Sequence, residues 1–155
     1  MRQLAKELFT YTQANWIVTL EHLIQTGGVA AASFLLNLVS FCQLTGQLLL
    51  LKHLVQQVVD SLRISEAEEA LAPCLGTLGN VLSDLGERDA ARTAFTEALE
   101  IYWPLFTQWP QAFGPNCLVV LRNYVNLTGE NADDPWWQRW QQFQADPDVE
   151  SGERT

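Results

Sequence analysis

Cationic side chains are scarce in this chain of 155 residues, in which nine Lys and Arg stand against eighteen Asp and Glu and give a net charge of −9. The deficit lies in residues 64–155, which carry five basic and fifteen acidic side chains. Residues 1–63 are nearly balanced, at four against three. Because an acidic surface repels phosphate groups, we expect no nucleic-acid partner, and a protein or peptide partner that is basic or apolar.

Motifs for metal binding, phosphate binding and catalysis are missing as well. The chain has three cysteines and two histidines, at Cys42, Cys74, Cys117, His22 and His53. Their wide spacing contains no C-x-x-C pair and no HExxH, which argues against a zinc site or a disulfide framework and favours a reducing compartment. Gly27-Gly28 lacks the Lys-Ser/Thr of a phosphate-binding loop. We therefore expect no enzyme activity, no metal and no cofactor.

The first residues do not read as a secretory signal, because Arg2, Lys6 and Glu7 open a periodic helical segment. This predicts a cytoplasmic location. Residues 23–51 contain no charged side chain and are numerous enough to span a bilayer. Polar residues and glycines interrupt the stretch, so we expect buried helices of a soluble protein. A membrane-associated protein anchored through residues 23–51 is the alternative.

What the sequence does contain is an internal repetition. Leu44-Thr45-Gly46, Asp84-Leu85-Gly86 and Leu127-Thr128-Gly129 each follow a helical apolar stripe, and their glycines lie 40 and 43 residues apart. A glycine directly after a helix suits the left-handed conformation in which many helices end. The pattern predicts three copies of one helical hairpin.

We expect seven helices joined by short turns. They are predicted at about 3–25, 30–44, 48–63, 67–85, 88–108, 115–128 and 135–144. Asp134 is expected to cap the last helix, with Pro135 as its first residue. Residues 1–144 would then form one helical domain, and residues 145–155, which are polar and acidic, a disordered tail.

The middle unit has the clearest pattern of large and small residues, between residues 72 and 105. Its members are Leu75, Leu78, Gly79, Leu82, Gly86, Ala91, Phe95 and Ala98. The small residues are expected to let two antiparallel helices approach closely, while the leucines and Phe95 fill the seam. The order resembles the tetratricopeptide repeat, which reads W-x-x-L-G-x-x-Y, then A-x-x-x-F, then Pro. Here Leu75 replaces the Trp, Leu82 replaces the Tyr, and Pro104 stands near the closing position.

This resemblance covers residues 33–143 and implies a right-handed α-solenoid of about three repeats plus an N-terminal helix. The flanking units depart from the pattern, since larger residues replace the small ones in the first and Arg122 replaces Gly79 in the third. The spacing exceeds the family period of 34 residues. Segment 101–116 looks like the lengthened second helix of a bacterial branch of these repeats, often found in signalling or defence proteins. Such arrays bind proteins, so the resemblance implies an interaction scaffold or adaptor.

The resemblance also implies a concave groove lined by the first helix of each unit. The position that faces this groove is Ser40, Asn80 or Asn123 in the three units. Asparagine amides both donate and accept hydrogen bonds, so they can bind an extended peptide backbone. The lysine clamp by which some members bind a terminal carboxylate is absent, although Arg122 supplies one cation. Asp84 near the rim favours a basic or apolar ligand.

Aromatic residues gather in the last predicted helix, at Trp136, Trp137, Trp140 and Phe143. They are either an interface or a cap over the end of the core, and we favour the cap. Apolar residues 48–51 and the uncharged helix before them favour self-association or docking into a larger assembly. The rival interpretation is a small helical enzyme or regulatory subunit with a site built from Asn80, Asn123, Arg122 and the histidines.

Overall fold

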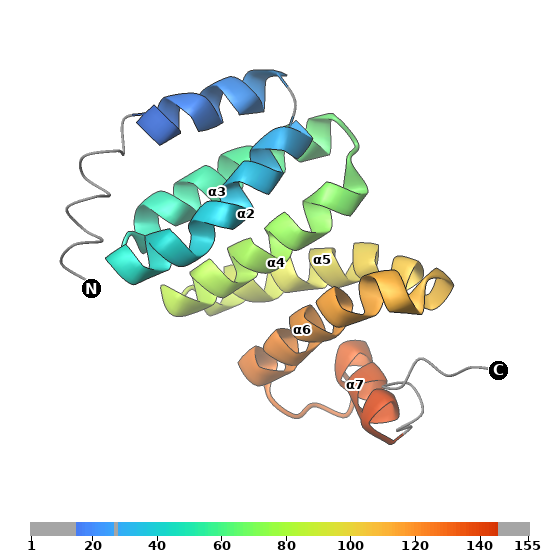
Figure 1. The fold of residues 1–155 in the computed structure, drawn as a ribbon. Helices are drawn as coiled ribbons and strands as arrows, with labels where there is room; N and C mark the ends of the chain where they lie inside the picture. The colour runs from blue at the N-terminus through green and yellow to red at the C-terminus, as the bar shows by residue number, and fades with distance from the viewer. Residues whose placement is uncertain (1–14, 27, 146–155) are drawn as a thin grey trace.

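A computed structural model describes residues 15–26 and 28–145, and all regular structure in these residues is helical. A helical segment at 15–26 comes first in the chain. It is followed by α2 (Gly28–Thr45), α3 (Leu48–Ile64), α4 (Glu68–Asp84), α5 (Arg88–Gln108), α6 (Pro110–Thr128) and α7 (Pro135–Ala145), as Figure 1 shows. The all-α class is thus confirmed for the described residues. Predicted helical residues 3–14 and tail residues 146–155 lie outside them, and Ala145, assigned to the tail, ends α7.

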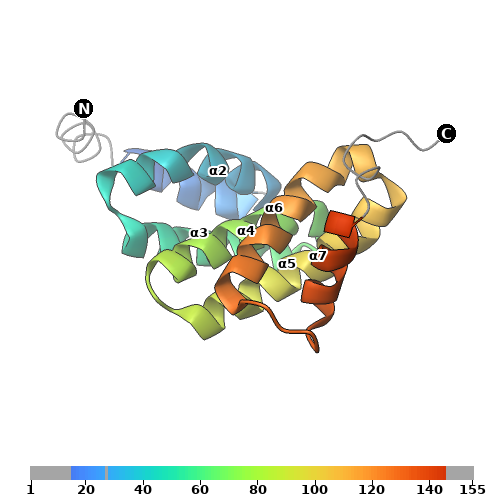
Figure 2. The ribbon, with the colours of Figure 1, turned by 90° about the horizontal axis from the view of Figure 1, so that it is seen from below.

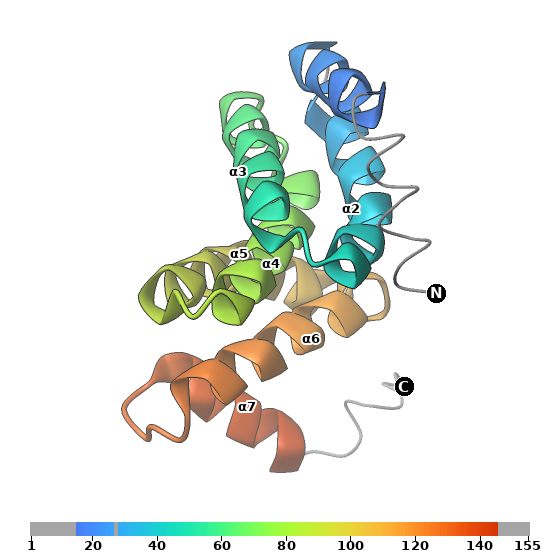
Figure 3. The ribbon, with the colours of Figure 1, turned by 90° about the vertical axis from the view of Figure 1, so that its left-hand side faces the viewer.

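The helices follow one another in space as they do in the chain. Each one contacts its neighbours in sequence, and in addition α2 contacts α4 and α4 contacts α6. The backbones of α2 and α6 do not approach each other, and neither do those of α3 and α5. Figure 3 shows the resulting order, with α2 and α3 as one pair, α4 and α5 as the next, and α6 and α7 last. Among α2 to α7, each hairpin therefore packs on the hairpin beside it, and the backbones of the first and third hairpins do not come into contact.

Glycines with positive φ end the first helix of each hairpin, as the repetition predicted. The φ angles are 73° at Gly46, 79° at Gly86 and 77° at Gly129. In the first two turns, the residue after the glycine donates its N–H to the carbonyl five residues back, at 2.9 Å in both. Gly129 instead donates its own N–H to the carbonyl of Val125 at 2.8 Å. The three corners are therefore correctly placed, but the third is built differently.

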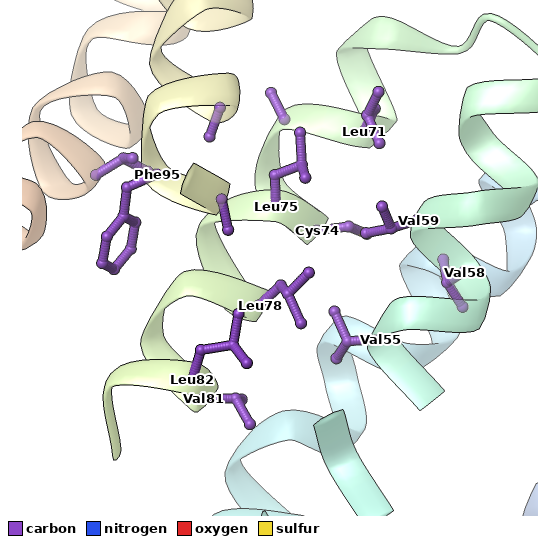
Figure 4. Packing of buried hydrophobic residues seen from close by; sticks show 14 of the residues in the cluster. Val55, Val58, Val59, Leu71, Cys74, Leu75, Leu78, Val81, Leu82 and Phe95 are labelled. Atoms are coloured by element: carbon purple, nitrogen blue, oxygen red, sulfur yellow. The ribbon is translucent and has the colours of Figure 1, made fainter. Parts of the chain in front are cut away.

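One hydrophobic cluster runs through the stack, from Trp16 to Trp136. Figure 4 shows its centre, where Val55 and Val59 of α3 lie opposite Cys74 and Leu78 of α4. All four side chains are at most 4% exposed. The larger residues at the seam of the first unit are accommodated in this core, since Leu51, Val55 and Val58 are fully buried.

A close approach within a hairpin occurs in the middle unit, between Gly79 of α4 and Phe95 of α5. A Cβ added to Gly79 would lie 2.5 Å from two atoms of the Phe95 ring. Phe95 is only 1% exposed, so its ring has little room to move away. The small residue at position 79 therefore permits the crossing, as the sequence pattern predicted.

The start of α6 corrects one predicted boundary. The sequence predicted helices at 88–108 and 115–128; α5 does end at Gln108, but α6 already begins at Pro110. Pro110 suits the first helical position, where no N–H is needed and φ is already helical. Pro115, expected at a helix start, lies inside α6 and is exposed. Segment 101–116 therefore belongs to two helices.

Among the described residues, α2 is the one helix long and apolar enough to cross a membrane by length and composition. Of its residues, 33% are buried inside the protein. It packs on α3 and α4, which places it within the stack of hairpins. Core helices of soluble proteins meet the same criteria, so this helix alone does not assign a location.

Candidate functional site

A polar hollow of ≈ 370 Å³ lies where the C-terminal halves of α2, α4 and α6 meet the start of α5. Figure 2 shows α4 between α2 and α6, which brings these three helices onto one face. The hollow is lined by Gln43, Asn80, Ser83, Asp84, Arg88, Phe95, Asn123, Asn126 and Leu127. Three of the residues predicted to bind a partner, Asn80, Asn123 and Asp84, are therefore brought together.

The lining residues come from matched positions of the three units. Asn80 and Asn123 are 43 residues apart, and Ser83 and Asn126 repeat the same offset one helical turn later. Gln43 stands 40 residues before Ser83, at the offset that separates the first two glycines. Residues three apart on a helix share a face, so each helix presents successive polar side chains to the hollow. The sequence interpretation found the row of Asn80 and missed the next row, which the same offsets reveal.

Asn80 and Asn123 are bonded to each other across the interface of α4 and α6. The Nδ2 atom of Asn123 donates a hydrogen bond to Oδ1 of Asn80 at 2.9 Å, in a partly buried position. An asparagine amide carries two N–H donors and an acceptor oxygen. The pair consequently retains the Nδ2 hydrogens of Asn80 and the Oδ1 of Asn123 for a ligand.

Two opposite charges lie on the wall of the hollow at the turn between α4 and α5. Arg88 donates a hydrogen bond from its guanidinium to the backbone carbonyl of Leu127 in the last turn of α6. Carbonyls in the last turn of a helix have no partner within the helix, so this bond satisfies one of them and ties α5 to α6. Asp84 is exposed and forms no ion pair with any described residue.

The other two predicted binding residues do not line the hollow. Ser40 is exposed on α2, one turn before Gln43, and Arg122 is exposed on α6 beside Asn123. Arg122 forms no ion pair with another described residue. It stands at the position of Gly79, where the middle hairpin has its close crossing.

The cysteines are core side chains. All three are free and buried, and burial raises the pKa of Cys74 and of Cys117 to about 12. A thiol with such a pKa remains protonated near neutral pH and is a poor nucleophile and a poor metal ligand. Within the described ranges, no group of three or more His, Cys, Asp or Glu is arranged to hold a metal ion. His22 and His53 are both exposed and lie outside the lining of the hollow.

The aromatic residues of α7 divide into two groups. Trp136 is 7% exposed and packs edge-on against Trp103 of α5, with ring centroids 5.9 Å apart. The guanidinium carbon of Arg139 lies 4.3 Å from the Trp136 ring centroid and 4.7 Å from that of Trp103. The remaining aromatic residues, Trp137, Trp140 and Phe143, are half-buried. Trp136 thus joins α7 to the core. The half-buried rings of the other three residues are compatible with a cap and with an interface.

Asp134 fixes the start of α7, as predicted for a capping residue. Its Oδ1 accepts hydrogen bonds from the N–H groups of Trp136 at 2.8 Å and Trp137 at 3.2 Å. Its Oδ2 accepts a 2.6 Å hydrogen bond from the hydroxyl of Tyr124, which is buried in α6. Burial, followed by this bond, raises the pKa of Tyr124. One carboxylate therefore caps α7 and anchors it to α6.

No model of a protein family matches this chain, and no curated protein sequence matches it either. The geometry described above is therefore the basis for a functional proposal.

Proposed function

We propose that this protein is a non-catalytic interaction module, a short right-handed α-solenoid of tetratricopeptide-like hairpins that binds an extended segment of a partner protein in the hollow. Repeat arrays of this kind bury each hairpin only against its neighbours and present a continuous surface for binding. The contacts of α2, α4 and α6 support this arrangement. A cytoplasmic adaptor, or a regulatory subunit of a larger assembly, fits the proposal.

The hydrogen bond between Asn80 and Asn123 is the observation that carries the proposal. The two residues were predicted as equivalent from a sequence offset, and they meet in the hollow that residues of α2, α4 and α6 line. Their free donor and acceptor groups match the C=O and N–H of an extended backbone. Gln43, Ser83 and Asn126 add polar groups one turn along, so the lining favours recognition of main chain over a particular apolar side chain.

The proposal is tested with an immobilised library of random twelve-residue peptides. Bound peptides are first identified with the native protein, and their affinities are then compared with those for Asn80→Ala/Asn123→Ala. Loss of two or more hydrogen bonds to the amides is expected to weaken binding by roughly tenfold or more.

The matched control is Gln141→Ala/Gln142→Ala, which removes two exposed amides of α7 outside the hollow. This control should bind like the native protein. Equal affinities for all three proteins, or capture of no peptide by the native protein, would remove the groove proposal.

A membrane-associated role is the second candidate, because α2 is uncharged and exposes apolar side chains such as Val29, at 54%, and Leu44, at 58%. Residues 23–51 would then lie against lipid. Flotation of the protein with neutral phosphatidylcholine vesicles tests this role. Co-flotation that is abolished by Val29→Ser/Leu44→Ser would favour the membrane over the groove proposal, and a protein that stays in the aqueous fraction would argue against it.

A further inference from the structure

We propose that Asp84 forms a subsite for a cationic group of the partner segment, either a lysine or arginine side chain or the amino terminus of the chain. The inference rests on the proposed function and goes further, because it assigns a positive charge to the ligand and names the residue that binds this charge. These sources share one chemistry, a positively charged nitrogen with N–H donors, which a carboxylate binds through charge-assisted hydrogen bonds.

The position of Asp84 in the hollow is the first support. Asp84 is exposed and lines the hollow together with the amide-bearing side chains. Among the described residues no Lys, Arg or His lies within ion-pair distance of its carboxylate. Arg88 lines the same hollow but is bonded to the carbonyl of Leu127. The carboxylate is therefore available to a ligand that reaches the amides.

The place of Asp84 in its helix is the second support, because it is unfavourable for the folded protein alone. Asp84 is the last residue of α4, where the helix dipole presents partial negative charge and favours a cation. The last turn of α4 contains no basic residue, and neither do the last turns of α2 and α6, which end beside the same hollow. All of these partial charges would attract a cation. A carboxylate that costs stability where it lines a site is typical of a binding residue.

The charges elsewhere in the described residues do not supply this cation. Lys52 and Arg63 of α3 pair with Glu87 and Glu97. Arg92 lies 3.8 Å from Asp134, and Arg139 lies over tryptophan rings. Arg122 is unpaired but does not line the hollow. Arg88, the cation that lines the hollow, forms no ion pair with Asp84, so within the described residues this carboxylate has no cationic partner and a ligand can supply one.

The experiment compares the native protein with Asp84→Asn, which removes the charge and keeps the size, and with the control Asp133→Asn. Asp133 is an exposed aspartate in the loop between α6 and α7, outside the hollow. The probe is the same random peptide library in two forms, one with free and one with acetylated amino termini. The native protein and Asp133→Asn are expected to select peptides enriched in Lys or Arg at one position, or peptides with a free amino terminus. Asp84→Asn should lose that enrichment and bind the selected peptides about 5- to 10-fold more weakly.

A second readout is the melting temperature without peptide, which Asp84→Asn should raise by about 1–3 °C, because the unfavourable charge at the helix end is gone. Selection of peptides by the native protein without basic enrichment, or identical selection by Asp84→Asn, would overturn this inference and leave the groove proposal intact. Capture of no peptide at all would overturn both. If the native protein binds peptides only from the library with free amino termini, the subsite recognises the amino terminus of the partner segment.

Discussion

The middle hairpin, α4 with α5, and the third hairpin, α6 with α7, begin alike and end differently. Both first helices carry polar side chains on the hollow and end at a glycine with positive φ. In the middle hairpin, Gly79 lets Phe95 of the second helix come into direct contact. In the third, the exposed side chain of Arg122 occupies the equivalent position. The middle hairpin thus has a direct contact at this position, and the third has an exposed arginine there.

In the third hairpin, the second helix is held mainly by contacts at its first residues and not by packing along its length. Asp134 binds the first amides of α7 and the hydroxyl of Tyr124, and Trp136 packs on Trp103 of α5. Beyond this end, the side chains of α7 are half-buried or exposed. In the middle hairpin a small residue at the crossing accompanies close packing of the two helices, whereas a cap and one aromatic ring hold the short terminal helix.

Replacing Phe95 by Ala should have the largest effect on stability. The ring is 1% exposed, and truncation of such a side chain costs about 3–5 kcal/mol of unfolding free energy. Phe143→Ala, in the half-buried part of α7, is expected to cost less than about 1 kcal/mol. Urea denaturation of both variants measures the difference. A Phe95→Ala protein as stable as Phe143→Ala would show that the seam of the middle hairpin does not hold the fold.

Alkaline pH should destabilise both hairpins equally through their buried thiols. Cys74 and Cys117 have folded-state pKa values near 12, against 9.0 for an unburied thiol. The pKa of each thiol is higher in the folded than in the unfolded protein. The free energy of unfolding is therefore unaffected by the thiols below about pH 8, and it falls as the pH rises from 9 through 12. Between pH 10 and 11 the loss should be about 1.4 kcal/mol per thiol.

Urea denaturation at several pH values checks this prediction. Cys74→Ala and Cys117→Ala should each flatten the pH dependence by the same amount, because both cysteines lie in first helices. A much smaller contribution from Cys117 would show that the looseness of the third hairpin extends into α6.

Gly79→Ala tests the close crossing directly. The added methyl group would lie 2.5 Å from the Phe95 ring, and overpacking of this kind costs about 1–3 kcal/mol. Gly114→Ala is the matched control in α6, because its Cβ would meet the Phe106 ring at 3.3 Å and needs only a small adjustment. Thermal unfolding should show a clear drop in melting temperature for the first variant and a smaller one for the second. Equal drops would indicate that helix position, and not the crossing, sets the cost.

Asp134→Ala should have the smallest effect on global stability and a local effect on α7. Loss of a helix cap costs about 0.5–2 kcal/mol, and the Tyr124 hydroxyl loses its acceptor. Hydrogen exchange should speed up in the amides of α7 and remain unchanged in α4 and α5, while Asp133→Ala leaves both unchanged. Faster exchange throughout α4 and α5 would contradict a purely terminal role for α7.

The sequence predicted those features that depend on local pattern. The glycine spacing located all three corners, and the small residue at position 79 located the close crossing, because both are encoded by residues within one hairpin. The same offsets placed Asn80 and Asn123 on a shared surface. The predicted range 115–128 begins later than α6 does, although Pro110 is a residue that suits the first position of a helix.

Side-chain contacts between different hairpins escaped prediction. Arg88 reaches the end of α6, and Arg139 of α7 lies over the rings of Trp103 in α5 and Trp136 in α7. Long side chains make these contacts across hairpins, so they depend on crossing angles that no sequence offset specifies. The choice between cap and interface for Trp137, Trp140 and Phe143 belongs to the same category, since it depends on what covers them.

The nearest-neighbour pattern of helix contacts also determines how the chain folds. Since each helix meets the preceding one first, little loop entropy must be lost before a contact forms, and folding should be fast for a domain of this size. Since α2 and α3 both pack on α4, the hairpin of residues 28–64 is expected to become stable once α4 and α5 have been synthesised. Folding would then proceed vectorially, with α7 closing the structure as the final step.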